Sequence, residues 1–145
     1  MPRSRLHADR GFTLIELLVA MLILGVLVAI SLGSFLGQKS KAQDTHAKTA
    51  VVTASKAMLA YGMDHRDYSG ATAADLIQIE SSLARARNLA VTAAANTFTI
   101  SVDSQSAAGA AFSIERTSGG DMIRDCTKPG YGGCRSEVDE HGDRW

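Results

Sequence analysis

The chain has 145 residues, with 15 basic and 15 acidic side chains and a formal net charge of zero, and 46% of its residues are hydrophobic. That length allows one modest domain beside a membrane segment. Without an excess of basic residues, the composition gives no indication of general nucleic-acid binding.

The chain begins with a short charged segment followed by a long apolar one. Residues 1–11 carry three arginines against one aspartate, a net charge of about +2. An uncharged run of 22 residues follows from Leu17 to Gln38, and as a helix it spans about 33 Å, enough to cross a bilayer core. Because positive residues flank the cytoplasmic end of a membrane span, we expect the residues after Gln38 to lie outside the cytoplasm.

A single carboxylate, Glu16, stands at the start of this apolar segment, in the sequence Gly11-Phe12-Thr13-Leu14-Ile15-Glu16. A carboxylate inside a bilayer costs on the order of 2.5–3.5 kcal/mol, so such residues are candidates for function. Cleavage between Gly11 and Phe12 frees an amine four residues from Glu16, and that amine is a natural partner for the charge.

The stretch from Gly11 to Leu18, followed by apolar residues, resembles the class III signal of type IV prepilins and pseudopilins. The resemblance is close over residues 1 to about 38 and extends to the rest only in general layout. It implies that a membrane aspartyl prepilin peptidase cleaves after Gly11 and N-methylates Phe12. It also implies that Glu16 sets the register of filament assembly by pairing with the Phe12 amine of a neighbour. An ordinary secretory signal has a shorter apolar core, and a plain anchor has no need of Glu16.

Three glycines, Gly25, Gly33 and Gly37, lie within the apolar run, and each weakens a helix by up to about 1 kcal/mol relative to alanine. One interpretation is close helix packing in the membrane. The other is a segment that unwinds when subunits pack into a filament. Many pilins carry proline at the position of Gly33, and this chain departs from that pattern.

The helical pattern continues past the membrane segment, and we expect one helix from about Phe12 to Tyr61. Its second half is amphipathic, with an apolar stripe on one face: Ala47, Val51, Ala54, Met58 and Tyr61. Asp44 and Lys48 occupy other directions and form a favourable i,i+4 pair. Gly62 is a plausible stop signal.

After a polar connection, Thr72 is expected to cap a short helix from about Ala73 to Ile79. Four strand-like segments follow: 89–93, 97–102, 111–116 and 121–126. Apolar residues alternate in 97–102 and 111–116, and a glycine turn precedes 121–126. An antiparallel meander of three or four strands covering the helix stripe accounts for these apolar faces.

Cys126 and Cys134 both follow the membrane segment. An extracytoplasmic domain permits disulfides, and an even pair favours a bridge between them. A zinc site is disfavoured because only His141 is nearby and such sites take four ligands.

The predicted fold is therefore α+β and, by resemblance, type IV pilin-like: a long helix, a small antiparallel sheet and a C-terminal disulfide loop. We expect a cleaved leader at residues 1–11, a transmembrane or filament-core helix at 12–38, and an extracytoplasmic head at 39–145 that includes the amphipathic half of the helix to about residue 61.

No catalytic pattern and no cofactor motif is recognisable, so we do not expect an enzyme. A terminal acidic segment supplies a weak calcium candidate, because calcium prefers clustered carboxylate oxygens: Glu137, Asp139, Glu140 and Asp143. A solvated terminal segment is the favoured interpretation, and no metal is predicted. Trp145 is expected to dock on the sheet.

The resemblance implies a structural subunit that is stored in the cytoplasmic membrane with its N-terminus inside. The subunit then polymerises with copies of itself into a helical filament at the cell surface. Its other implied partners are the prepilin peptidase and an inner-membrane assembly platform with its motor. The sequence favours a pilus-like filament over the alternatives, which are a pseudopilin of a type II secretion-like system, a minor pilin, and a monomeric membrane-anchored binding module.

Overall fold

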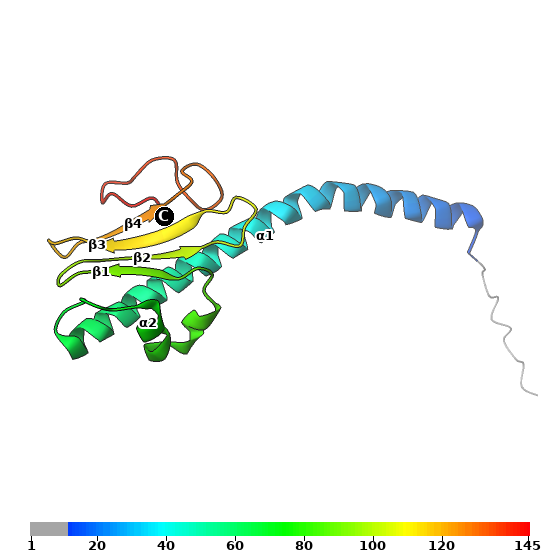
Figure 1. Cartoon of the computed structure of the whole chain (residues 1–145). Helices are drawn as coiled ribbons and strands as arrows, with labels where there is room; N and C mark the ends of the chain where they lie inside the picture. Colours follow the sequence, from blue (N-terminus) through cyan, green and yellow to red (C-terminus); the bar gives the residue numbers. More distant parts are fainter. Residues whose placement is uncertain (1–11) are drawn as a thin grey trace, which may run out of the picture. The chain divides into compact units, whose positions relative to one another are not determined.

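A computed structural model describes residues 12–145, which fall into two compact units, one ending at Leu36 and the other running from Gly37 to Trp145. One helix, α1 (Leu14–His65), contributes to both units. The second unit continues with a short helix, a 3-10 helix and four strands (Figure 1): α2 (Ala73–Ile79), η1 (Ser81–Arg85), β1 (Ala90–Ala93), β2 (Phe98–Asp103), β3 (Ala111–Arg116) and β4 (Met122–Cys126). The α+β class predicted from the sequence is confirmed.

The sheet is a four-stranded antiparallel meander in the order β1-β2-β3-β4. Its register pairs Ile100 of β2 with Val91 of β1 and with Ile114 of β3. Because side chains alternate between the faces of a strand, one face collects the buried residues Phe98, Ile100 and Val102 of β2, together with those of β3. This is the face that the alternating sequence pattern predicted.

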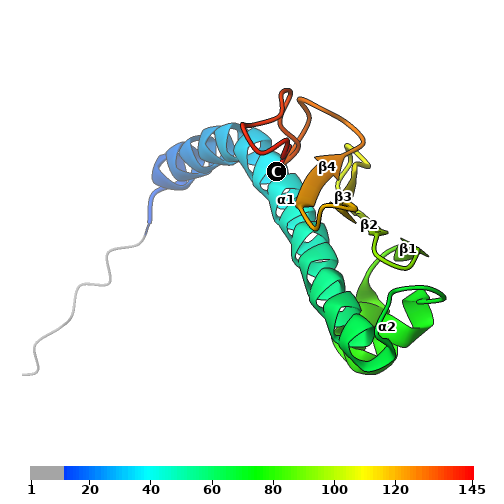
Figure 2. The ribbon, with the colours of Figure 1, turned by 90° about the vertical axis from the view of Figure 1, so that its left-hand side faces the viewer.

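The core of this unit lies between the inner face of the sheet and the second half of α1. Figure 2 shows the strands along one side of that part of the helix. Val51, Ala54 and Met58 are fully buried there, and Tyr61 is partly buried against the same core. The helix stripe read from the sequence is therefore the face that packs against the sheet.

The helix ends later than predicted, because Gly62 does not stop it. Instead α1 continues to His65 and Arg66 follows with a φ of 69°, a left-handed residue of the kind that commonly terminates helices. A Cβ on Gly62 would clash with the Tyr68 ring, so this glycine allows the chain after the helix to fold back against it. Gly62 thus serves packing rather than termination.

The C-terminal segment covers the outer edge of the sheet. Arg144 N donates to Arg124 O of β4 at 2.8 Å, and Arg135 N donates to Arg144 O at 2.9 Å. Trp145 Nε1 donates to Asp125 O at 2.8 Å, and its ring meets that of Phe112 edge-on with centroids 5.9 Å apart. The expected docking of Trp145 on the sheet is confirmed. Pairing along β4 also protects an edge that would otherwise expose backbone hydrogen-bonding groups.

Candidate functional site

The start of α1 is organised by Thr13 and Glu16. Glu16 N donates to Thr13 Oγ1 at 3.3 Å, while the Glu16 carboxylate accepts from Thr13 N at 3.4 Å and from Thr13 Oγ1 at 3.2 Å. This reciprocal arrangement is a capping box, which satisfies backbone N–H groups that a helix start leaves unpaired. Glu16 therefore has a structural role within a single chain, beside the assembly role that the resemblance implies.

The apolar part of α1 is long enough to cross a membrane. The window Leu14–Ser31 has a mean hydropathy of 2.8, and none of it is buried within the chain. Large side chains around this segment are more than half exposed, including Leu14, Ile23 and Ile30. Exposed apolar surface on this scale needs lipid or other protein chains around it.

The structure describes only some of the residues that the sequence singled out around this segment. Gly11 and the leader before it lie outside the described residues, and Phe12 precedes the helix and is exposed. The backbone of α1 is helical through Gly25, Gly33 and Gly37. Unwinding at these glycines therefore stays a prediction about the assembled state.

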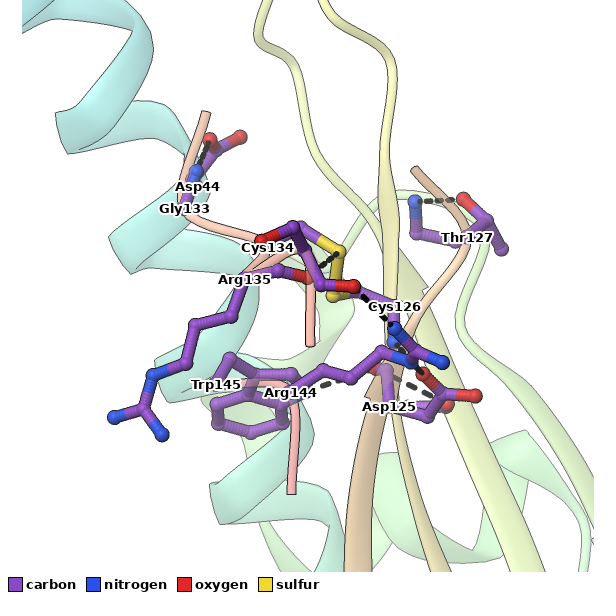
Figure 3. Close-up of a disulfide and its surroundings, with 12 residues drawn as sticks. Asp44, Asp125, Cys126, Thr127, Gly133, Cys134, Arg135, Arg144 and Trp145 are labelled. Atoms are coloured by element: carbon purple, nitrogen blue, oxygen red, sulfur yellow. Dashed lines mark hydrogen bonds and ion pairs between the residues drawn. A yellow bond between two sulfur atoms is a disulfide. The ribbon is translucent and has the colours of Figure 1, made fainter. Parts of the chain in front are cut away.

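Among the described residues of the second unit, the most buried polar residue is Asp44 of α1, whose exposed fraction is 1%. Its carboxylate accepts from Ser104 Oγ at 2.6 Å and from Gly133 N at 2.8 Å, the latter in the disulfide loop (Figure 3). The sequence placed Asp44 on a face away from the core, and that placement is wrong. The loop after β4 returns to cover this part of the helix, so Asp44 becomes an anchor for it.

Lys48, one turn later, holds the same loop through a different atom. Its Nζ donates to Gly133 O at 2.6 Å and lies 5.2 Å from the centroid of the Phe112 ring and 5.7 Å from that of Trp145. No ion pair within 4 Å links it to Asp44 in the part of the chain that the structure describes. The i,i+4 pair expected from the sequence is thus replaced by two separate bonds to Gly133.

The surroundings of Asp44 and Lys48 shift the pKa values of both side chains. Burial acts to raise the pKa of Asp44, but the hydrogen bonds from Ser104 and Gly133 and the charge of Lys48 outweigh it and lower the pKa below 3.8. Burial lowers the pKa of Lys48 below its usual 10.5, opposed by Asp44 and reinforced by Arg135. A carboxyl group whose pKa lies below 3.8 is ionised at neutral pH, so Asp44 is charged there.

The approach of the loop to α1 requires its two adjacent glycines. Gly132 has a φ of 61°, and a Cβ there would clash with Asp44 Oδ2. A Cβ on Gly133 would lie 3.0 Å from Lys48 Nζ. Cys134 is joined to Cys126 at the end of β4, with their Cα atoms 5.9 Å apart. The predicted disulfide is present, and it ties the loop to the sheet while Gly133 ties it to the helix.

Two of the acidic residues near the C-terminus, Asp139 and Asp143, form hydrogen bonds with other residues of the chain. Asp143 accepts from Arg124 N at 2.7 Å and from Arg124 Nη1 at 3.1 Å. Asp139 accepts from the backbone N atoms of His141 and Asp143, both at 3.0 Å, and from Arg135 Nη1. Glu137 and Glu140 are exposed. Among residues 12–145, no group of three or more His, Cys, Asp or Glu side chains is placed to hold a metal ion.

Sequence reasoning missed two of these features for different reasons. The capping box was readable, because Thr13 and Glu16 have the Thr-x-x-Glu spacing that marks a helix start. The roles of Asp44 and Lys48 had no local signal, since their partner Gly133 lies 89 and 85 residues further along the chain.

Comparison with known proteins finds a match at the N-terminal part of the chain. Residues 6–32 match the family model described as "Prokaryotic N-terminal methylation motif". No solved structure matches the chain.

Most of the curated relatives that match carry the name of a secretion protein. The type II secretion system core protein G of Pectobacterium carotovorum subsp. carotovorum is 36% identical over 43% of this chain and 40% of that protein. The protein of the same name from Vibrio cholerae is 34% identical over 45% of this chain and 44% of its own length. The type IV major pilin protein PilA of Myxococcus xanthus is 34% identical over 42% of this chain and 29% of its own length. The matched stretches thus span less than half of each of these relatives.

Proposed function

We propose that this chain, which belongs to the type IV pilin and pseudopilin family, is a structural subunit of a helical filament. The observation that carries the proposal is the exposed apolar segment Leu14–Ser31, which has Glu16 near its start and lies within the residues that match the methylation motif. Before assembly, the segment inserts into the cytoplasmic membrane. After cleavage following Gly11, the apolar segments of many copies pack together and exchange lipid contacts for protein contacts.

Within the filament, Glu16 sets the axial register of the incoming subunit. Its carboxylate is least costly to bury beside a cation, and the amine of Phe12 in a neighbouring copy supplies one. A contact between different surfaces of identical subunits does not close on itself, so it generates an open filament. The prepilin peptidase and an inner-membrane assembly platform with its motor are the further partners that this mode of assembly requires.

The filament is assigned to a type II secretion-like pseudopilus, because secretion core protein G is the name of most of the matching relatives. This choice reverses the preference for a pilus that the sequence alone gave. A type IV pilus is the second candidate, favoured by the 34% identity to the Myxococcus xanthus pilin.

The test of processing is the intact mass and the N-terminal peptide mass of the protein taken from assembled filaments without reducing agent. The expected chain begins at methylated Phe12 and lacks the two hydrogens lost on forming the disulfide. A chain that retains Met1–Gly11, or absence of the protein from filaments, contradicts the proposal and favours a monomeric membrane-anchored module.

The phenotype of a deletion mutant distinguishes the two candidate filaments. Deletion of the protein is expected to abolish secretion of exoproteins into the medium while leaving surface pili intact. Loss of surface pili with normal secretion would instead assign the chain to a type IV pilus.

A further inference from the structure

The second unit contains a groove of about 380 Å³ between α1, the η1 region and the end of β2. Its apolar lining includes Ala47 and Ala50 of α1 and Leu83 of η1. Two basic side chains also line it and both are exposed: Arg85 at the end of η1, and Arg87 from the segment that leads to β1. We call this feature the η1 groove.

The η1 groove has an excess of positive charge. Asp103 is the one acidic residue among the groove's lining residues, and its Oδ2 already accepts from Asn88 Nδ2 at 2.7 Å. Within the described part of the chain, neither Arg85 nor Arg87 uses its guanidinium in a hydrogen bond or ion pair. Two exposed arginines beside apolar walls fit a ligand that combines carboxylates with an apolar side chain.

The chain itself presents such a ligand in residues 136–142, which we call the acidic loop. Glu137 and Glu140 are exposed there, and Val138 between them is 51% exposed. The loop has a fixed form, because Asp139 N donates to Asp143 O at 2.9 Å and the Asp139 carboxylate accepts from two backbone N–H groups. A pre-formed loop loses little conformational entropy on binding.

We propose that the acidic loop of one copy docks in the η1 groove of the next copy, with Val138 against the apolar walls and Glu137 and Glu140 beside Arg85 and Arg87. This contact rests on the proposed filament and names a head-to-head interface within it. The acidic loop is attached along β4, whereas the η1 groove adjoins the segment that leads to β1, at the opposite edge of the sheet. The two surfaces differ, so their pairing between copies is heterologous and repeats without closing.

A charge-swap experiment on the full-length protein in filament-forming cells tests the contact. Arg85→Glu/Arg87→Glu places like charges opposite the acidic loop, and Glu137→Lys/Glu140→Lys does the same from the other side. Since like charges that face each other across an interface disfavour association, each double variant is expected to lower filament yield about tenfold or more. Combining all four changes restores the opposite-charge pairing and is expected to recover most of the yield.

Lys56→Glu/Arg66→Glu is the matched control, because both residues are exposed basic side chains of the same unit outside the groove. It is expected to assemble like the wild type. Normal assembly of the two charge-reversed variants, or failure of the four-fold variant to recover any yield while its thermal stability is unchanged, overturns the docking proposal.

A second measurement locates the contact directly. A photo-crosslinking amino acid replacing Thr49, which is exposed and lines the η1 groove, is expected to join to a peptide containing residues 137–140 of another copy. Crosslinks only to other segments contradict the groove contact while leaving the filament in place. Absence of filaments from the wild-type protein itself removes both proposals.

Discussion

The Asp44 carboxylate of α1 accepts a hydrogen bond of 2.8 Å from the backbone N of Gly133, a residue 89 positions later in the disulfide loop. Ser104 Oγ, which follows β2, donates to the same carboxylate at 2.6 Å. One side chain of the helix therefore holds both a loop of the sheet and the C-terminal loop. The stability of the second unit should depend on it more than on any exposed charge of α1.

Replacing Asp44 by alanine is expected to lower the free energy of unfolding by about 1–3 kcal/mol, because the Gly133 N–H and the Ser104 hydroxyl lose a buried acceptor. Denaturant titration of the full-length protein in detergent measures this loss. Asp64→Ala is the control, since Asp64 lies on the same helix and is exposed. Equal effects of the two substitutions would contradict the anchoring role of Asp44.

The stability of the second unit should fall in acid because the pKa of Asp44 is lowered on folding. A carboxyl group with a lowered folded-state pKa stabilises the fold fully above its unfolded value of 3.8, and this contribution is lost as the pH falls through the lower, folded value. Melting temperatures measured from about pH 6 to about pH 2 should drop below about pH 4. The drop should be smaller in Asp44→Asn, and an unchanged profile in that variant would show that other carboxyl groups cause it.

Gly132→Ala should destabilise the protein more than Gly130→Ala. Both glycines have positive φ values, 61° and 84°, so alanine at either position costs about 1–2 kcal/mol in backbone strain. At Gly132 the added Cβ also clashes with Asp44 Oδ2, whereas at Gly130 its nearest neighbour is Ser136 Cβ at 3.7 Å. Unfolding free energies of the two variants measure the difference, and equal values would mean that the loop does not need its close approach to α1.

Removing the disulfide with Cys126→Ser/Cys134→Ser is expected to cost about 2–5 kcal/mol of stability. Reduction of the wild-type protein should cause a similar loss when the unfolding midpoint is measured with and without reductant. The double variant serves as the control, because reductant should leave it unaffected. A reductant effect of equal size in that variant would trace the loss to something other than the bridge.

Two substitutions at Glu16 separate its capping role from its charge. Glu16→Gln keeps a side chain that can complete the capping box with Thr13, but it removes the charge that we propose pairs with the Phe12 amine of a neighbouring copy. Glu16→Ala removes both. If the charge sets the register, both variants are processed and membrane-bound, and both give a low filament yield by quantitative electron microscopy. A normal yield from Glu16→Gln would assign Glu16 to helix capping alone.

The sequence predicted the elements whose signals are local. The stripe from Ala47 to Tyr61 marked the buried face of α1, alternation marked β2 and β3, and Thr72 capped α2 where expected, with Asp75 N donating to its hydroxyl. Local signals fail where tertiary packing decides. Gly62 looked like a helix stop because the sequence pattern does not show that the chain after the helix folds back and places the Tyr68 ring against this glycine.

At the candidate site, the roles of Gly11, Phe12 and Glu16 stay predictions, which rest on the spacing of these residues before an apolar run. The polar anchor beneath the disulfide loop was not predictable, because an aspartate on an amphipathic helix usually faces water. Its burial follows only once the loop between Cys126 and Cys134 has a place in the fold.

The docking of Trp145 gives this protein a built-in optical reporter. It is the only tryptophan in the chain, and its indole is held by Asp125 O and the Phe112 ring, with Lys48 Nζ nearby. Its fluorescence should therefore report whether the C-terminal segment is packed on β4 and α1. Emission spectra can follow the packing of this segment without any added label.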